Sequence, residues 1–571
     1  MLPFINIPFA YLSGILGASP DEIKLIFSIL ISYPLTAVLK RLPDNKPWQK
    51  NLFNIAVSAF YLVGLFNLWG GLRTLQISSI GAYCIAMFIE GPFMPWIGFV
   101  FCMGHMSINH IARMDPNADP GAVDITGAQM VLVMKLTAFC WNVHDGRLPA
   151  SELSDLQKTN SIKVMPNLLD FFGYVFFFPG LLVGPAFDYQ EYKTYISTKM
   201  FELPAGVDPS KAPATRKKRK IPRSGTPAAI KAACGVLWVF TFLQLNSKYY
   251  PEYFLSDDYM KYSIFRRIFM LYMLGITTRT KYYGVWFLSE GSCILSGIGY
   301  NGIDEATGRA KWDRLSNVKP MEVETAQNVR AYLGGWNVNT NHWLRNYMYL
   351  RVTPKGKKPG FQATLATFVT SAFWHGFYPG YYLAFVLGSL LQNIAKYGRR
   401  LVRPFFISKD GKTPTANKKY YDAFTWFITQ FAFCFVTAPF NLLTLSAAIK
   451  VWSRVYFYGL VGVAICFGFL YSPARPMLAS QLRKRNGTDE KPQLERQTSH
   501  DSAKMPPGGT LGLPDDPEKE LQELVKEVQE EVAKRRRRGS NVTDVKAVLQ
   551  QKIDEFKRKG VSIVDAGKKI E

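Results

Sequence analysis

The chain lacks the sequence patterns of disulfide-rich, metal-binding and repetitive proteins. Its 571 residues contain only seven cysteines, and no two of them form a C-x-x-C motif. Most lie in apolar segments, which is typical of small buried hydrophobic residues and indicates neither a disulfide framework nor a zinc site. No repeat with a period of roughly 20–50 residues is present, so a solenoid or propeller is not expected. The cysteines are Cys84, Cys102, Cys140, Cys234, Cys293, Cys434 and Cys466.

A removable signal peptide is also not predicted. Residues 1–20 contain apolar stretches but no basic segment and no clear cleavage site, and a secretory signal needs both. We expect the first membrane-spanning helix to serve as an uncleaved signal.

Long hydrophobic runs, by contrast, fill most of the chain. The mean hydropathy of −0.01 conceals two parts, an apolar region over residues 1–474 and a polar tail over 475–571. A spanning helix needs about 20 apolar residues, and short or broken helices are tolerated at membrane depth where they line a cavity or are buried in protein. We therefore predict an all-α, polytopic integral membrane bundle with about eleven transmembrane or re-entrant helices. The predicted spans are residues 23–39, 52–70, 80–104, 128–143, 168–184, 228–247, 264–288, 361–374, 377–395, 422–445 and 451–472.

The chain is strongly basic, with a formal net charge of +25. The tail holds 21 Lys and Arg against 17 Asp and Glu, so most of the excess lies in loops of the apolar region, such as Arg216–Lys220 and Arg399–Arg400. Basic loops between hydrophobic spans are typical of the cytosolic side of a membrane protein and attract anionic lipid headgroups. Because the charge is scattered between spans, we expect no nucleic-acid partner.

The tail has an organisation of its own. Residues 486–517 are rich in Pro, Gly, Asp and Ser, which predicts disorder, whereas apolar residues at helical spacing predict amphipathic helices over 518–538 and 545–556. These helices are expected to be solvated, with a membrane-surface or partner helix as the alternative. The chain ends Lys568-Lys569-Ile570-Glu571, which resembles a dilysine endoplasmic reticulum retrieval signal. Such a signal is read by a retrieval coat in the cytosol.

The segment Ser371–Gly380 is the most informative part of the sequence. It places His375 inside an aromatic, apolar run between hydrophobic spans. An ionisable residue at membrane depth is a candidate functional residue, and imidazole suits general acid–base catalysis near neutral pH. A structural histidine bonded to a backbone carbonyl is the alternative. Trp374 beside it excludes water, and Gly376 allows a close backbone approach.

A cluster of asparagines lies three dozen residues upstream, between Trp336 and Trp343. An asparagine amide stays neutral in a low-dielectric site and can donate to the oxyanion of a tetrahedral intermediate. The alternative is that these amides cap a helix beginning near His342. The two segments together indicate acyl transfer, in which the histidine removes a proton from a hydroxyl as that hydroxyl attacks a thioester. The candidate amides are Asn337, Asn339 and Asn341.

Two other patterns do not predict cofactor sites. Gly297–Gly302 matches G-x-G-x-x-G, but it follows an apolar membrane segment, whereas dinucleotide binding requires a preceding strand. Glycines that relieve crowding at an active-site loop are the preferred interpretation. His105 and His110 are five residues apart, off the i,i+4 face of a helix, so supporting or structural roles are expected for them and for His144 rather than metal binding.

The sequence is similar to the membrane-bound O-acyltransferases, most closely to the broad-specificity fungal lysophospholipid acyltransferases. The resemblance covers roughly residues 20–475. Its motifs are Asp124–Met130, Trp286–Gly291 with Gly297–Gly302, Trp336-Asn337 with Trp343-Leu344, Phe373–Gly376, and Gly184-Pro185 with Tyr189 and Tyr192.

This resemblance implies a bundle of transmembrane helices around a chamber, with His375 as the catalytic base and Asn337 as its partner. Acyl-CoA and a lysophospholipid are the implied substrates, surrounded by membrane lipids, and no cofactor is expected. The product would form by transfer to the free, sn-2 hydroxyl in the endoplasmic reticulum membrane, with the C-terminus cytosolic. Residues implied to line the site are Trp336, Asn339, Trp343, Trp374, Glu290, Tyr300 and Asn301.

Two rival functions remain open on the sequence. A related acyltransferase could act on a sterol, a diacylglycerol or a protein. A polytopic transporter could use His375 and Asn337 to bind a polar solute, although no inverted repeat is found and intramembrane charge is sparse.

Overall fold

The computed structural model describes residues 3–16, 19–115, 123–203, 213–215, 219–304, 307–353, 361–408 and 413–486. The chain divides into two compact units, Met1–Gly512 and Leu513–Glu571, and every described residue belongs to the first. The predicted tail helices and the dilysine end lie outside the described residues. The predicted domain boundary after residue 474 falls at the start of helix α20 and stays a prediction.

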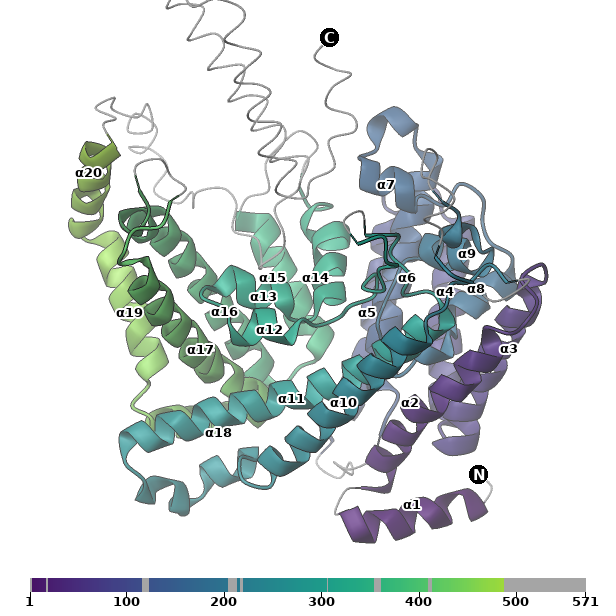
Figure 1. Ribbon diagram of the computed structural model, residues 1–571, viewed down its shortest axis with the longest axis horizontal. Helices are drawn as coiled ribbons and strands as arrows, with labels where there is room; N and C mark the ends of the chain where they lie inside the picture. Colours follow the sequence, from purple (N-terminus) through teal and green to yellow (C-terminus); the bar gives the residue numbers. More distant parts are fainter. Residues whose placement is uncertain are drawn as a thin grey trace, which may run out of the picture. The chain divides into compact units, whose positions relative to one another are not determined.

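The described residues form helices joined by loops and contain no strand beyond three isolated bridges, as Figure 1 shows. The all-α class is therefore confirmed. The α-helices are α1 (Pro3–Leu16), α2 (Pro20–Leu39), α3 (Pro47–Ala59), α4 (Trp69–Phe88), α5 (Met94–Ala112), α6 (Thr126–Arg147), α7 (Asp155–Asn160), α8 (Leu168–Val175), α9 (Tyr189–Ile196), α10 (Gly225–Asn246), α11 (Ile264–Ser296), α12 (Pro320–Glu324), α13 (Val329–Gly335), α14 (Val338–Leu344), α15 (Phe361–His375), α16 (Pro379–Tyr397), α17 (Lys418–Leu442), α18 (Leu445–Arg454), α19 (Tyr458–Tyr471) and α20 (Ala474–Asn486).

Four predicted spans are not continuous helices. In the run 52–70, α3 passes into a π-helix, Phe60–Leu65, and the chain turns at Asn67, with a φ of +58°, before α4 begins. The run 80–104 is split between α4 and α5, because Gly91 has a φ of +88° and Pro92 follows it. The run 168–184 forms only the short α8 and one 3-10 turn, Phe178–Gly180, where Pro179 has no N–H to donate. The run 451–472 is bent by 81° between α18 and α19, at two residues with positive φ, Tyr456 and Phe457.

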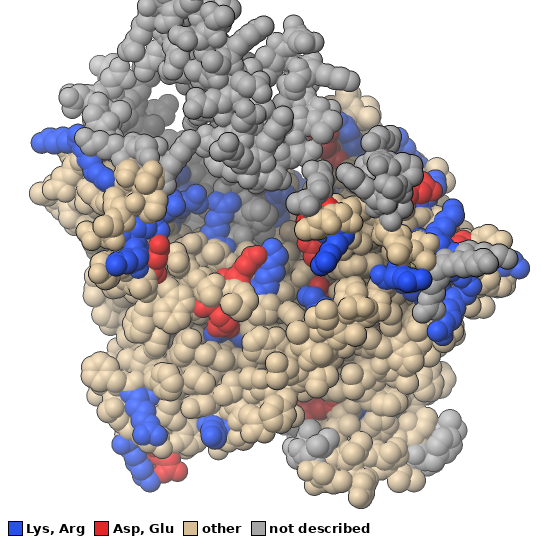
Figure 2. Space-filling model, viewed as in Figure 1, with Lys and Arg blue, Asp and Glu red and all other residues tan. Residues whose placement is uncertain are grey.

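Helix length and composition identify fewer spans than the sequence predicted. Among the described residues, three segments are long and apolar enough to cross a membrane, namely Pro20–Leu39, Gly225–Leu255 and Lys418–Leu442, and the bent pair α18–α19 would make a fourth. The total of about eleven stays a prediction. The face in Figure 2 carries a broad band with few charged residues between two groups of charged ones, as expected where acyl chains surround a protein.

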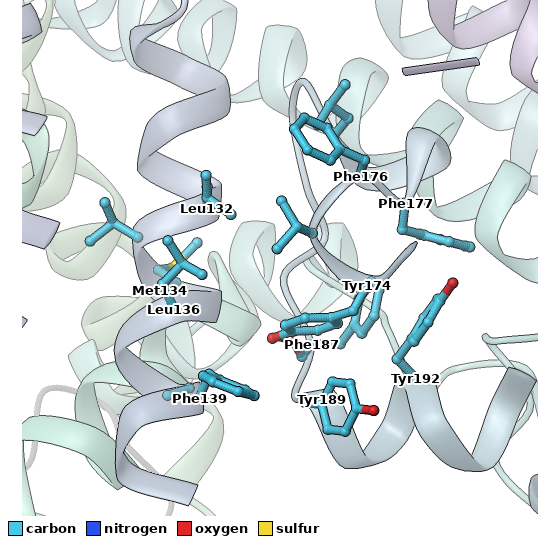
Figure 3. Packing of buried hydrophobic residues seen from close by; sticks show 14 of the residues in the cluster. Leu132, Met134, Leu136, Phe139, Tyr174, Phe176, Phe177, Phe187, Tyr189 and Tyr192 are labelled. Atoms are coloured by element: carbon cyan, nitrogen blue, oxygen red, sulfur yellow. Dashed lines mark hydrogen bonds between the residues drawn. The ribbon is translucent and has the colours of Figure 1, made fainter. Parts of the chain in front are cut away.

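Helix α6 lies at the centre of the largest hydrophobic cluster and is buried over nearly its whole length. One side of it faces an aromatic group from the segment 174–192, which includes Tyr174, Phe187 and Tyr189 (Figure 3). The buried ammonium of Lys135 donates to the Tyr174 carbonyl at 2.5 Å and lies 4.2 Å from the centre of the Tyr174 ring. Since close-packed interiors move little, α6 is a rigid support for the segments of the chain that pack on its other faces.

Candidate active site

His375 is the last residue of α15, and its ring is held in one tautomer. The Nδ1 atom lies 2.6 Å from the carbonyl oxygen of Ser371, one turn earlier in the helix. Because a carbonyl oxygen can only accept, Nδ1 carries the proton and Nε2 keeps a lone pair. No described residue forms a hydrogen bond with Nε2, and the residue is half-buried. The imidazole is therefore prepared to accept a proton.

Four aromatic rings surround this imidazole. Their centroids lie 4.6 Å (Trp374), 4.9 Å (Phe385), 5.2 Å (Phe440) and 5.9 Å (Tyr381) from that of His375. They come from α15, α16 and α17, and their apolar faces exclude bulk water. A general base in such a site exchanges protons with a bound hydroxyl in preference to solvent.

Asn337 is the residue just before α14 and has the left-handed conformation, with φ 43° and ψ 55°. Asparagine is one of the few residues other than glycine that adopts this region readily. Its Oδ1 accepts a hydrogen bond from Thr340 Oγ1 at 2.9 Å, which fixes the amide plane. Within the described chain, its Nδ2 group has no hydrogen-bond partner, so two N–H donors remain available.

The other two asparagines are committed to local structure. Asn341 Nδ2 donates to the carbonyls of Leu333 and Trp336, both at 2.8 Å. Asn339 donates to the Leu315 carbonyl at 3.4 Å. The predicted capping of a helix beginning near His342 is wrong, because α14 begins at Val338 and Asn337, its N-cap residue, makes no side-chain cap hydrogen bond. Asn339 and Asn341 lie inside the helix.

Helix α6 supports both candidate segments. The Trp374 indole donates from Nε1 to the Met130 carbonyl at 2.9 Å, and the Trp343 indole donates to Thr137 Oγ1 at 2.9 Å. Residues 130 and 137 lie two turns apart on one face of the helix, and the Trp343 and Trp374 rings pack with their centroids 6.1 Å apart. The segments that carry His375 and Asn337 thus meet on one rigid helix.

The remaining predicted site residues lie with other elements. Trp336 packs against Trp286 of α11, with ring centroids 5.2 Å apart. Glu290, also on α11, is 1% exposed and pairs with Lys231 of α10 at 2.9 Å. Tyr300 packs between Phe201 and Trp312, and Asn301 donates to Asp313 at 3.0 Å, both in the loop after α11. Each of these residues has a local structural partner.

The chain leaves α14 through a π-helical segment, Arg345–Tyr349, that is tied to the end of α6. Arg351 donates from both terminal nitrogens to Asp145, at 2.8 and 2.5 Å. Burial alone would raise the pKa of the Asp145 carboxyl, but the hydrogen bonds from Arg351 hold the pKa below its usual value. The pair therefore stays charged at neutral pH and holds the segment that follows α14 against the end of α6.

The glycine pattern lies at the C-terminal end of a helix. Gly297 ends α11 with a φ of +109°, so the glycine motif follows a helix and not the strand that dinucleotide binding needs. Within the described ranges, no group of three or more His, Cys, Asp and Glu side chains could hold a metal ion.

Several site residues had no clear signal in the sequence. Thr340 orients the Asn337 amide, and Phe440 reaches His375 from 65 positions away in the sequence. Tyr381 and Phe385 follow His375 closely on a helix, so their spacing of four residues could have indicated a shared face. Nothing in a single sequence distinguishes Phe440 from other apolar residues of its helix.

Comparison with known proteins identifies the family to which the chain is similar. Residues 117–437, more than half of the chain, match the model of the membrane-bound O-acyltransferase family, and the matched region contains both His375 and Asn337. The chain is 44% identical to a lysophospholipid acyltransferase of Schizosaccharomyces pombe over 85% of this chain and 93% of that protein. It is 43% identical to a lysophospholipid acyltransferase of Saccharomyces cerevisiae over 80% of this chain and 75% of that protein. A human membrane-bound glycerophospholipid O-acyltransferase 2 is 30% identical over 76% of this chain and 80% of that protein.

Proposed function

The chain belongs to the membrane-bound O-acyltransferase family, and we infer that it is a lysophospholipid acyltransferase. It moves a fatty acyl group from acyl-CoA to the free hydroxyl of a lysophospholipid. The observation that carries the catalytic assignment is that Nε2 of His375 and Nδ2 of Asn337 both have no hydrogen-bond partner among the described residues, on two segments that share α6 as their support.

The reaction follows from these two groups. Nε2 of His375 accepts the proton of the acceptor hydroxyl as the oxygen attacks the thioester carbonyl carbon. The negative charge that develops on the carbonyl oxygen is stabilised by an N–H of Asn337, already oriented by Thr340. The intermediate then collapses, the carbon–sulfur bond breaks, and the CoA thiolate leaves and takes the proton from His375. An ester and free CoA are formed.

We assign the acceptor position and the cellular location on sequence grounds. A lysophospholipid with its acyl chain at sn-1 offers the sn-2 hydroxyl. The dilysine end, with Lys568 and Lys569, favours an endoplasmic reticulum membrane protein whose C-terminus is cytosolic and is recognised by a retrieval coat. The related functions on sterol, diacylglycerol or protein acceptors are less consistent with relatives named for lysophospholipids.

Replacing all seven cysteines by serine should leave substantial activity, because attack on the thioester is direct and no thiol carries the acyl group. Cys102, Cys140, Cys293 and Cys434 are buried, so a loss of folded protein must be corrected for by measuring turnover per folded molecule. Incubation of the wild-type protein with acyl-CoA alone, followed by mass spectrometry, checks the same point. An acyl chain found on any cysteine would contradict the one-step mechanism.

The proposed cytosolic position of the C-terminal tail leads to a second prediction. The sequons at Asn486 and Asn541 should remain unglycosylated, because the glycosylating enzymes are lumenal. Replacing Lys568 and Lys569 by serine should let part of the protein leave the endoplasmic reticulum with unchanged activity per molecule. Glycan on either asparagine would reverse the assigned topology, and a large loss of activity at normal abundance would give the tail a catalytic role.

A further inference from the structure

A second buried histidine contacts the turn that carries His375. His110 lies near the end of α5 and is 5% exposed. Its Nε2 lies 3.1 Å from the carbonyl oxygen of Trp374. Since the carbonyl oxygen can only accept, Nε2 of His110 carries a proton and donates it. This nitrogen is therefore not a base for the reaction.

The carbonyl that His110 satisfies belongs to the peptide that leads into His375. The last four carbonyls of a helix have no partner within the helix, and Trp374 is the penultimate residue of α15. No described backbone N–H donates to its oxygen. An unpaired carbonyl in a buried membrane site is unfavourable, and the His110 N–H supplies the hydrogen bond that a further helical turn would have supplied. Because a peptide unit is planar, fixing this carbonyl also fixes the plane that contains the N and Cα atoms of His375, from which its side chain leaves.

Gly376 and His110 fit one another. Gly376 has a φ of +120°, a conformation that side chains other than hydrogen disfavour. A Cβ atom at this position would lie 3.0 Å from His110 Nδ1 and 3.4 Å from its Cγ. The imidazole of His110 therefore occupies the space that a side chain at position 376 would need, and it packs directly against the turn after His375.

We propose that His110 is a positioning residue for acyl transfer, which holds the Trp374–His375 peptide so that Nε2 of His375 points at the acceptor hydroxyl. The inference rests on the proposed role of His375. The other contacts of this turn hold different parts of it, since the Trp374 indole binds Met130 and the Gly380 N–H binds the Leu443 carbonyl at 2.7 Å. Among the described side chains, only His110 donates to the peptide next to His375.

The test compares two substitutions at His110 in the purified full-length protein. In His110→Gln, the side-chain amide places an N–H near the position of Nε2, whereas His110→Leu has a similar size and no donor. We expect His110→Leu to lower kcat about 10–100-fold, as for a small misplacement of a catalytic group, with the KM for acyl-CoA within about threefold of wild type. His110→Gln should recover kcat to within about fivefold of wild type.

A matched control lies on the same helix. His105 is a partly buried histidine whose Nδ1 lies 2.8 Å from Ser78 Oγ, away from the turn. His105→Leu should keep kcat within about twofold of wild type, although it also loses a histidine hydrogen bond. Folded protein and Tm are measured for every variant, so that turnover is expressed per folded molecule.

Three results would overturn the proposal. The first is wild-type kcat in His110→Leu with only a lower Tm, which would make the role purely structural. The second is an equal loss of kcat in the glutamine and leucine variants, which would exclude the N–H as the cause. If the leucine variant does not fold, His110→Asn is measured in its place. The asparagine side chain is one methylene shorter than that of glutamine, so its amide is too short to donate to the Trp374 carbonyl. Equal kcat in the asparagine and glutamine variants is the third.

Measuring His375→Ala alongside separates this inference from the mechanism on which it rests. An active His375→Ala removes the proposed base, whatever His110 does. An inactive His375→Ala together with a fully active His110→Leu removes only the positioning role.

Discussion

Replacing His375 by alanine should lower kcat by about 10²–10⁴-fold while the protein accumulates normally in the membrane. The physical reason is that a lipid hydroxyl is a poor nucleophile at neutral pH, and no other described base is oriented as His375 is, with Nδ1 bound to Ser371 and Nε2 unbonded. The measurement is release of CoA and formation of labelled phospholipid per folded molecule. The substitution also removes some packing around the imidazole. The resulting loss of stability should be small, so the fall in kcat is the main effect.

His375→Gln is the stricter form of this experiment. Glutamine keeps a polar side chain of similar length among Phe385, Phe440 and Tyr381 but cannot accept the proton at neutral pH. It should be as inactive as the alanine variant. Activity within a few-fold of wild type for either variant, at equal amounts of folded protein, would remove His375 from the mechanism.

Replacing Asn337 should lower the rate by about 10²–10³-fold, the typical effect of removing one oxyanion donor. Because Asn337 has a left-handed backbone with φ 43°, alanine would add backbone strain to the loss of the amide. Two substitutions separate these effects. In Asn337→Gly, glycine adopts the left-handed backbone without strain and has no side-chain amide. In Asn337→Asp, the carboxylate keeps the acceptor for Thr340 but has no N–H donors. Both should be inactive in steady-state assays and near wild type in folded protein.

The neighbouring asparagines provide the matched controls for this prediction. Asn339→Ala and Asn341→Ala remove amides that bind backbone carbonyls, so each should lower stability by about 1 kcal/mol and leave turnover per folded molecule largely unchanged. An inactive Asn339→Ala with an active Asn337→Gly would show that the catalytic amide was assigned to the wrong residue.

The sequence predicted the fold class and the identity of the two central segments because their signals are local. A membrane helix needs a continuous apolar run, and a histidine inside such a run is conspicuous. The bent helices were harder to predict, since hydropathy does not report backbone conformation. Tyr456 and Phe457 have positive φ between two apolar stretches, and neither residue type predicts a turn.

The spacing of the three asparagines could not decide which of them is the catalytic amide. Asn337, Asn339 and Asn341 alternate in the sequence and are chemically identical. What distinguishes them is the set of carbonyls that each amide meets after folding, from Leu315, Leu333 and Trp336. Likewise, His110 could be flagged in the sequence only as a histidine in an apolar segment. Its contact with Trp374, 264 residues away, exists only in the folded chain.

The most direct test of the mechanism is acyl transfer by the purified protein. Wild type and His375→Ala are incubated with labelled acyl-CoA and a panel of lysophospholipids that differ in headgroup, and labelled phospholipid and free CoA are both quantified. Wild type should form one phospholipid per CoA released, labelled at the position that was free in the acceptor, and His375→Ala should form neither. Release of CoA without phospholipid, or equal phospholipid from the two proteins, would contradict direct transfer by His375.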